Sequence, residues 1–164
     1  MARWADLEAA APELATSGRE LLERFRFVYI GTLRRDGTPR ISAVEARIVL
    51  GELAMSMIPG SLKARDLRRD PRIALNAPLQ HPDDPNEEFK LRGRAVEVRN
   101  GRLTEAVAAA IEGTSGWRPP LEWPFFAVDI DEAALIAWNA GVMRMSRWSP
   151  GEGVRVIERP VAVL

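Results

Sequence analysis

The chain of 164 residues has no cysteine, one histidine (His81) and only two lysines, Lys63 and Lys90. The absence of cysteine excludes disulfides, thiolate metal sites and a cysteine nucleophile, and it agrees with a cytoplasmic protein. A catalytic metal usually needs about three converging ligands, so we expect no metal site. His81 stands in a polar, proline-rich stretch. We expect it in a surface loop, and axial ligation of a haem by His81 is the weaker alternative.

An excess of charge and long apolar runs are also missing. Lys plus Arg and Asp plus Glu each number 23, which gives a net charge of zero. General attraction to nucleic acid or to a membrane surface usually needs a basic excess, so neither partner is expected. No apolar run approaches the roughly 18 residues that a membrane span needs. Any functional positive charge must therefore be local.

The length predicts a single domain over residues 1–164. Its first part, about residues 6–25, has apolar residues at three- to four-residue spacing and predicts a helical segment. Pro12 is suited to the first turn of a helix, and Ser17-Gly18-Arg19-Glu20 resembles a capping box. The segment is therefore one helix or two.

After residue 25 the pattern changes to short β-type runs joined by tight turns. Asp36-Gly37 predicts a hairpin, because glycine adopts positive φ at little cost. We expect a bulge near Val96, and a helix over 102–112 that Gly113 ends. The predicted strands are 27–33 (covered on both faces), 40–50, 53–58, 72–77, 89–98, 125–130, 133–138, 143–148 and 154–158. Many short strands with few helices favour an antiparallel barrel or sandwich.

A short helix predicted over 61–69 begins directly after a strand and a Pro-Gly turn. The unpaired N–H groups at a helix start attract anions, and the Ser61 hydroxyl and Lys63 ammonium group stand in its first turn. If the two preceding strands pair, Arg40 lies toward the same end of the sheet. The alternative is a capping serine beside a solvated lysine.

Two segments, YIGTLRRDGTPRISAV and LAMSMIPGSLKARDLRRDPRIAL, carry a family resemblance across residues 27–77. In order and spacing they resemble the pyridoxamine 5′-phosphate oxidase-like group of FMN-binding split barrels. FKLRGRAVEV and the C-terminal RMSRWSPGEGVR continue the resemblance more loosely. It implies a mainly β fold, a six-stranded antiparallel split barrel with a few flanking helices, and a homodimer with a flavin in a groove between subunits.

The resemblance also implies roles for individual residues. Arg40, Ser61 and Lys63 would hold the flavin phosphate. The ring system would lie against Ile41, Ser42 and Ala43, with Ser56 and Met57 nearby and Trp148 reaching the groove from the tail. Trp148 is otherwise a core or interface residue, as tryptophans commonly are. The flavin itself would perform the redox chemistry, which explains why the sequence shows no Ser-His-Asp or paired-carboxylate constellation and identifies no catalytic residue.

The sequence departs from the family pattern in two places. Glu45 stands where many relatives carry a basic or aromatic residue, so it faces away, pairs with Arg47 or indicates another ligand. The tail lacks the histidine that binds substrate phosphate in true pyridoxamine-phosphate oxidases, which argues against vitamin B6 oxidation. Arg65, Arg68 and Arg69 would suit the longer anionic tail of a deazaflavin, or they form a solvated helix face.

The sequence therefore predicts an FMN-dependent oxidoreductase that acts on a small organic substrate. The alternatives are a deazaflavin-dependent reductase and a non-catalytic haem- or flavin-binding protein on the same fold. A cofactor-free structural or regulatory dimer is the third alternative.

Overall fold

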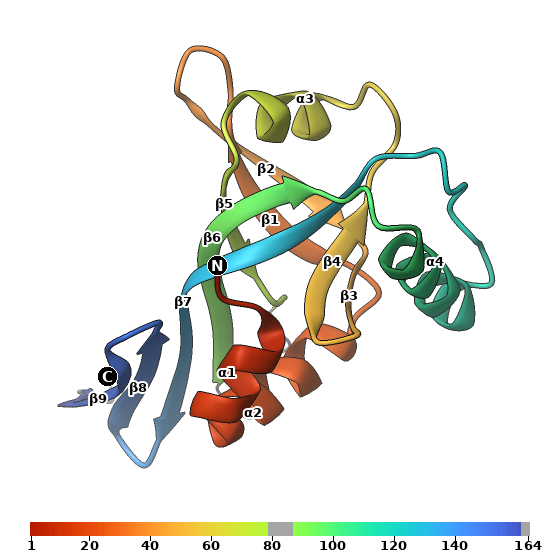
Figure 1. The fold of residues 1–164 in the computed structure, drawn as a ribbon. Coiled ribbons are helices and arrows are strands. Elements are labelled where there is room, and N and C mark those ends of the chain that lie inside the picture. The colour runs from red at the N-terminus through yellow and green to blue at the C-terminus, as the bar shows by residue number, and fades with distance from the viewer. Residues whose placement is uncertain (79–86, 162–164) are drawn as a thin grey trace.

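The structure, a computed structural model, describes residues 1–78 and 87–161, so His81 and most of its predicted loop lie outside the described residues. Figure 1 shows one strongly curved sheet with helices at its ends and edges. The elements are α1 (Trp4–Ala10), α2 (Pro12–Glu23), β1 (Val28–Leu33), β2 (Pro39–Val44), β3 (Ala46–Val49), β4 (Glu52–Ser56), α3 (Leu62–Arg69), β5 (Arg72–Asn76), β6 (Glu87–Glu97), α4 (Gly101–Ser115), β7 (Phe125–Asn139), β8 (Val142–Ser149) and β9 (Gly153–Pro160).

All strand pairs that the structure describes are antiparallel, and the strand order is β2-β1-β5-β6-β7-β4-β3. β8 pairs with β7 and β9 continues from β8. The two ends of the main path, β2 and β3, follow one another in the chain but do not pair, so the sheet does not close on itself. The mainly β, antiparallel architecture is confirmed. The expected number of six strands is not confirmed, because the residues that the structure describes form a nine-stranded sheet.

Tight turns and local interruptions set the boundaries of the strands. Gly37 has φ of 82° in the turn between β1 and β2, where the Arg34 N–H donates to the Thr38 carbonyl at 2.8 Å. The predicted strand over 40–50 is interrupted at Glu45, which separates β2 from β3. The two strands predicted over 125–138 form one long strand, β7.

Two expectations about strand detail are wrong. β1 is covered on one face only, since buried Val28 and Ile30 alternate with Tyr29, which is 51% exposed. The irregularity in β6 lies between Arg92 and Gly93, not near Val96. A Cβ atom on Gly93 would stand 2.0 Å from the Asp129 carbonyl oxygen, so the close approach of β7 requires glycine there.

The N-terminal helical segment consists of two helices, which pack against one side of the sheet. Pro12 begins α2, while the segment that resembled a capping box lies inside α2. The Trp4 ring packs edge-on against Phe89 with centroids 5.9 Å apart, which fixes α1 on β6. Helix α4 begins with Asn100, whose side chain accepts the Arg102 N–H. It ends at Gly116 with φ of 71°, not at the predicted Gly113.

Within residues 1–78 and 87–161, no helix is long and apolar enough to cross a bilayer.

The contrast between two glycines gives a test of the fold. Gly93→Ala should lower the free energy of unfolding by at least about 2 kcal/mol, because the β6–β7 ladder has no room for a methyl group. Gly113→Ala, inside α4 and with nothing near its Cβ position, should be neutral or stabilising by up to about 1 kcal/mol. Urea denaturation of both variants measures the difference. Equal effects would contradict the register assigned to β6 and β7.

Candidate functional site

The candidate site forms where α3 crosses the ends of β1 and β2 (Figure 1). β2 is an edge strand of the described sheet, so one side of its backbone has no neighbouring strand among residues 1–78 and 87–161. The chain reaches α3 through Pro59-Gly60, where Gly60 has φ of 71°. Ser61 precedes the first residue of α3, and the Arg65 N–H donates to its carbonyl. A strand, a glycine turn and a short helix thus bring the helix start beside the sheet edge.

Two polar contacts attach α3 to β2. The Lys63 Nζ donates to the Ala43 carbonyl oxygen at 3.0 Å. The Arg40 Nε donates to the Asp66 Oδ2 at 2.7 Å. Lys63 and Asp66 are three residues apart and so lie on one face of the helix. The structure therefore places Arg40 and Lys63 at the same helix–strand junction. The expected pairing is not the reason, because β2, which carries Arg40, pairs with β1, and it is β3 rather than β2 that pairs with β4.

Asp66 is a residue of this junction that the sequence did not reveal. It is 4% exposed and accepts hydrogen bonds from Arg40, from Arg69 at 3.1 Å and from Thr32 at 3.1 Å. Burial alone would raise its pKa, but these three hydrogen bonds hold the pKa below the ordinary value of 3.8. Asp66 is therefore an ionised carboxylate. One sequence signal could have identified Asp66: it stands three residues from both Lys63 and Arg69, a spacing that places helical residues on one face.

Two predicted site residues, Ser56 at the end of β4 and Ser61 before α3, have buried hydroxyls without a partner among the described residues. The Oγ atoms of Ser56 and Ser61 are the buried side-chain oxygens without a partner in the part of the chain that the structure describes. Ser61 occupies the N-cap position of α3, but its side chain caps nothing, so the expected capping bond is absent. An unpaired buried hydroxyl costs about 1–3 kcal/mol, and a ligand with hydrogen-bonding oxygens would satisfy it.

The other predicted residues are divided between the two faces of β2 and the core. Arg40 and Ser42 are half-buried, whereas Ile41 and Ala43 are exposed on the opposite face. Met57 follows β4, and its side chain is buried in the core. Trp148 is 3% exposed in the same core cluster. It lies on β8, far from α3 in Figure 1, so one chain does not bring it to this junction.

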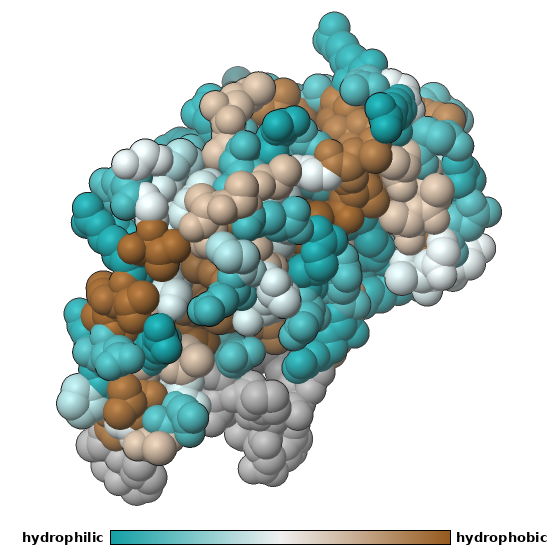
Figure 2. Space-filling model, turned by 60° about the horizontal axis from the view of Figure 1, so that its bottom comes forward, coloured by the Kyte–Doolittle hydropathy of each residue, from teal (hydrophilic) through white to brown (hydrophobic). Residues whose placement is uncertain are grey.

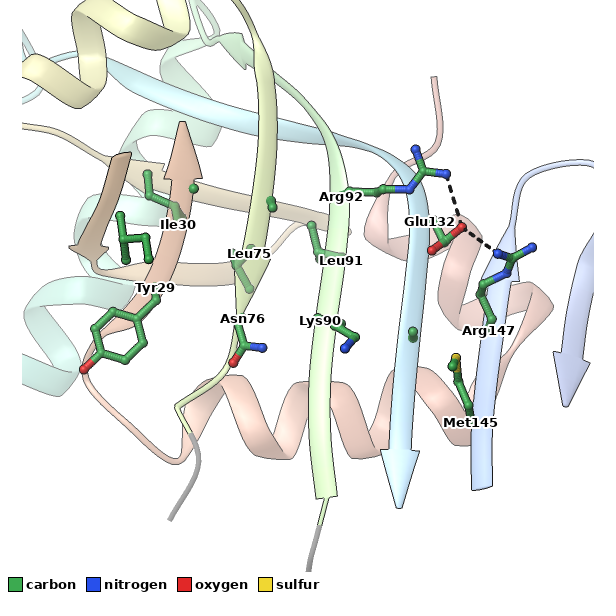
Figure 3. Close-up of a pocket in the computed structure, with 14 residues that line it drawn as sticks. Tyr29, Ile30, Leu75, Asn76, Lys90, Leu91, Arg92, Glu132, Met145 and Arg147 are labelled. Carbon is green, nitrogen blue, oxygen red and sulfur yellow. Dashed lines mark hydrogen bonds and ion pairs between the residues drawn. The ribbon is translucent and has the colours of Figure 1, made fainter. Parts of the chain in front are cut away.

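A pocket of about 470 Å³ opens on the sheet face that carries Ile41. Across neighbouring strands, Ile41, Gly31, Ala74, Arg92 and Glu132 stand opposite one another in register. The small residues in the middle of this row leave the hollow. Figure 3 shows Tyr29 at one end of the pocket and the charged side chains at the other.

The charged end of the pocket is built around one carboxylate. Arg92 and Arg147 both approach the Glu132 Oε2, at 3.2 and 3.4 Å (Figure 3). Lys90 also lines the pocket and pairs with Glu88 at 3.4 Å. Of the three cations at alternate positions of β6, Lys90, Arg92 and Arg94, the first two thus lie in the pocket wall.

Glu45 is neutralised by arginines. Its carboxylate accepts from the Arg26 Nε at 2.6 Å and lies 3.9 Å from an Arg47 nitrogen. Arg47 is itself buried, which lowers its pKa, and it donates to Thr114 of α4 at 2.7 Å. Of the three readings of Glu45 that the sequence left open, the structure supports pairing with Arg47 and adds Arg26.

The family-level comparison now decides the classification, because residues 15–137 match the model of the family described as pyridoxamine 5′-phosphate oxidase. The chain belongs to this family. No curated protein is similar to it in sequence.

Several solved structures share the fold of this pyridoxamine 5′-phosphate oxidase family member. An FMN-binding, oxidase-related protein from Nostoc punctiforme superposes with a TM-score of 0.63 at 12% identity, over 96% of this chain and 97% of that one. PhzG from Burkholderia lata, in complex with tetrahydrophenazine-1-carboxylic acid, gives 0.66 at 11% identity, over 98% and 97%. A heme binding protein from Mycobacterium smegmatis gives 0.63 at 17% identity, over 91% and 58%.

The α3–β2 junction fits the phosphate of an FMN cofactor in the chemistry of its donors. Lys63 and Arg40 carry positive charge, and the Ser61 hydroxyl has no partner among the described residues. The helix start adds N–H groups that favour an anion. Burial lowers the pKa of Lys63 below its ordinary value of 10.5, so its charge is uncompensated and a bound anion would stabilise it.

The lowered pKa of Lys63 leads to a pH dependence of stability. The unfolded chain binds this proton more tightly than the folded chain, so the Lys63 contribution to stability rises with pH between the lowered pKa and 10.5. Lys63→Met removes the titration. The unfolding free energy of the wild type minus that of Lys63→Met should therefore increase from neutral pH to pH 10.5. A difference that stays constant in urea denaturation at each pH would contradict the burial of the ammonium group.

Proposed function

We propose that the protein is an FMN-dependent oxidoreductase that acts on a small organic substrate. The observation that carries this proposal is the α3–β2 junction, where Lys63 and Arg40 each form a hydrogen bond between α3 and β2, and where Ser61, the residue before α3, has a hydroxyl without a partner among the described residues. Membership in the pyridoxamine 5′-phosphate oxidase family supports the cofactor, and the FMN-binding relative from Nostoc punctiforme supports it further.

Different residues of the chain would bind the phosphate and the ring system of the cofactor. The Lys63 ammonium group and the Arg40 guanidinium would bind the phosphate, and the Ser61 hydroxyl would donate to it. The free edge of β2 and the exposed Ile41 would lie along the ring system. FMN, when bound, supplies hydride or electron transfer, so the protein needs to bind, orient and shield the reactants.

The pocket beside Ile41 suits the substrate. Its volume of about 470 Å³ is in the range of sites for small organic ligands, and its lining is mostly apolar with a few charged groups. The lack of a histidine in the tail, between Met143 and Glu158, argues against vitamin B6 as that substrate.

Two of the three α3 arginines that would suit the longer anionic tail of a deazaflavin are already paired. Arg68 is held by Glu97 at 2.6 Å, and Arg69 is held by Asp66 and by the Leu33 carbonyl, while Arg65 forms no ion pair among the described residues. The charges of Arg68 and Arg69 are therefore partly neutralised, which favours FMN over a cofactor with a second anionic segment. A cytoplasmic location stays a prediction from the composition.

FMN titration tests the proposal directly. The protein should bind FMN and show flavin absorption near about 450 nm. Lys63→Ala should weaken binding by about 1.5–3 kcal/mol, at least about tenfold in Kd, because a charge-assisted contact to phosphate is lost.

Arg68→Ala is the matched control, since it removes a cation from the same helix but outside the junction. It should leave Kd within about twofold. An absorption band near about 400 nm without flavin would identify a haem protein instead. Equal Kd values for the wild type and Lys63→Ala would remove Lys63 from the site.

We also propose that the active form is a homodimer. The face of the sheet around the pocket exposes apolar side chains, with Ile41 at 78% and Tyr29 at 51%. Figure 2 shows further apolar patches that reach the surface between hydrophilic side chains. A flavin along β2 of one chain would leave much of its ring in solvent. A second copy over this face would cover both the ring and the exposed side chains.

Ile41→Arg tests the dimer. An unpaired charge in a packed apolar interface costs several kcal/mol, so this variant should sediment as a monomer at micromolar concentration while the wild type sediments as a dimer. Leu121→Arg places the same charge at an exposed apolar position in the loop before β7 and should remain dimeric. A wild type that is monomeric, or a dimeric Ile41→Arg, would contradict the proposal.

A further inference from the structure

We infer that Asp66 is a positioning residue, which holds the Arg40 guanidinium so that its Nη atoms face the cofactor phosphate. The inference rests on the proposed function, since it concerns the same junction. Neither the family match nor the structural relatives assign a role to Asp66.

The carboxylate of Asp66 joins three elements. Its Oδ2 accepts from the Arg40 Nε of β2 at 2.7 Å and from the Thr32 hydroxyl of β1 at 3.1 Å. Its Oδ1 accepts from the Arg69 Nη2 of its own helix at 3.1 Å. Thr32 and Arg40 are cross-strand partners, so both donors approach Asp66 from one face of the sheet.

The use of Nε is what makes this contact directional. A carboxylate that held both outer nitrogens of Arg40 would occupy the edge that recognises phosphate. Here Asp66 contacts Nε, and neither Nη atom of Arg40 is hydrogen-bonded within residues 1–78 and 87–161. The side chain is also only 20% exposed, so it is held close to the junction. Two N–H-bearing atoms remain for an anion.

An amide cannot replace this carboxylate. Both oxygens of Asp66 accept hydrogen bonds from donors, whereas asparagine offers one oxygen and a donor NH₂ group. In either orientation of the Asp66→Asn amide, Arg40 loses its ionic partner, because it faces the NH₂ group or a neutral carbonyl oxygen in place of the carboxylate. Arg69 is also held by the Leu33 carbonyl, whereas Arg40 has no second anchor among its described contacts, so the guanidinium of Arg40 is the one that is released.

A purely electrostatic effect of Asp66 and a positioning role for Asp66 predict opposite changes in FMN binding for Asp66→Asn. The substitution removes one negative charge beside a phosphate, so Coulomb attraction alone would tighten FMN binding. If Asp66 positions Arg40, FMN binding should instead weaken, by about tenfold for the loss of one charge-assisted contact. Riboflavin, which lacks the phosphate, should bind both proteins equally well.

A double-mutant cycle assigns the effect to Arg40. In an Arg40→Gln background, Asp66→Asn should no longer weaken FMN binding, because the group that it positions is gone. Arg68→Gln, which changes the charge of the same helix without touching Asp66, serves as the control and should leave the ratio of the FMN and riboflavin Kd values unchanged.

¹⁵N NMR of the wild-type protein without flavin tests the Arg40–Asp66 contact even if a variant does not fold. The Arg40 Nε–H, buried against Asp66, should give a slowly exchanging signal in ¹⁵N NMR. Thermal unfolding of each variant confirms that it is folded before titration.

Three results would overturn the inference: tighter or unchanged FMN binding in Asp66→Asn, an equal loss for FMN and riboflavin, or fast exchange of the Arg40 Nε–H. Failure of the proposed function would give a different result from these three. In that case the wild type itself binds FMN no more tightly than riboflavin, and the inference falls with it even if the Arg40 signal is protected.

Discussion

The position of α3 on the sheet edge depends on the hydrogen bonds between its polar side chains and β1 and β2. The helix has eight residues and buries little apolar surface, chiefly Ala64 and Leu67. Its orientation is therefore fixed by Asp66 on Arg40 and Thr32, and by Lys63 on the β2 backbone. Buried polar groups of this kind stabilise only one arrangement, because any other would leave a charge unpaired. The same contacts leave a positively charged junction with unpaired donors.

The curved sheet provides the rigid frame that such a junction needs. The β6–β7 ribbon forms its longest ladder, and the close approach at Gly93 sets its register. Neighbouring strands then place Ile41 and the arginines of the pocket on one face, while Arg40 faces Thr32 and α3. If FMN binds here as proposed, the cofactor supplies the redox chemistry, and the protein requires this kind of placement more than it requires acids and bases of its own.

The sequence predicted the parts of the fold that are encoded locally. Asp36-Gly37, the Pro-Gly turn before α3 and the alternating strands are short-range patterns, and they correctly located the β1–β2 hairpin and the start of α3. The sequence did not predict the place of Asp66 in the junction. Its partners Thr32 and Arg40 are distant in sequence, and the arginine-rich segment around it resembled a solvated helix face. The position of the bulge and the burial of Trp148 likewise depend on which strands pair across the sheet, and no local pattern contains that information.

The most direct test of the phosphate seat is ³¹P NMR of FMN bound to the wild-type protein across a range of pH. If Arg40, Lys63 and the start of α3 surround the phosphate, they stabilise its dianion. The bound signal should then keep the dianion shift below about pH 6, where a free phosphomonoester takes up a proton. A bound flavin whose phosphate titrates like that of free FMN would show that the phosphate lies in solvent, and the assignment of this junction would be wrong.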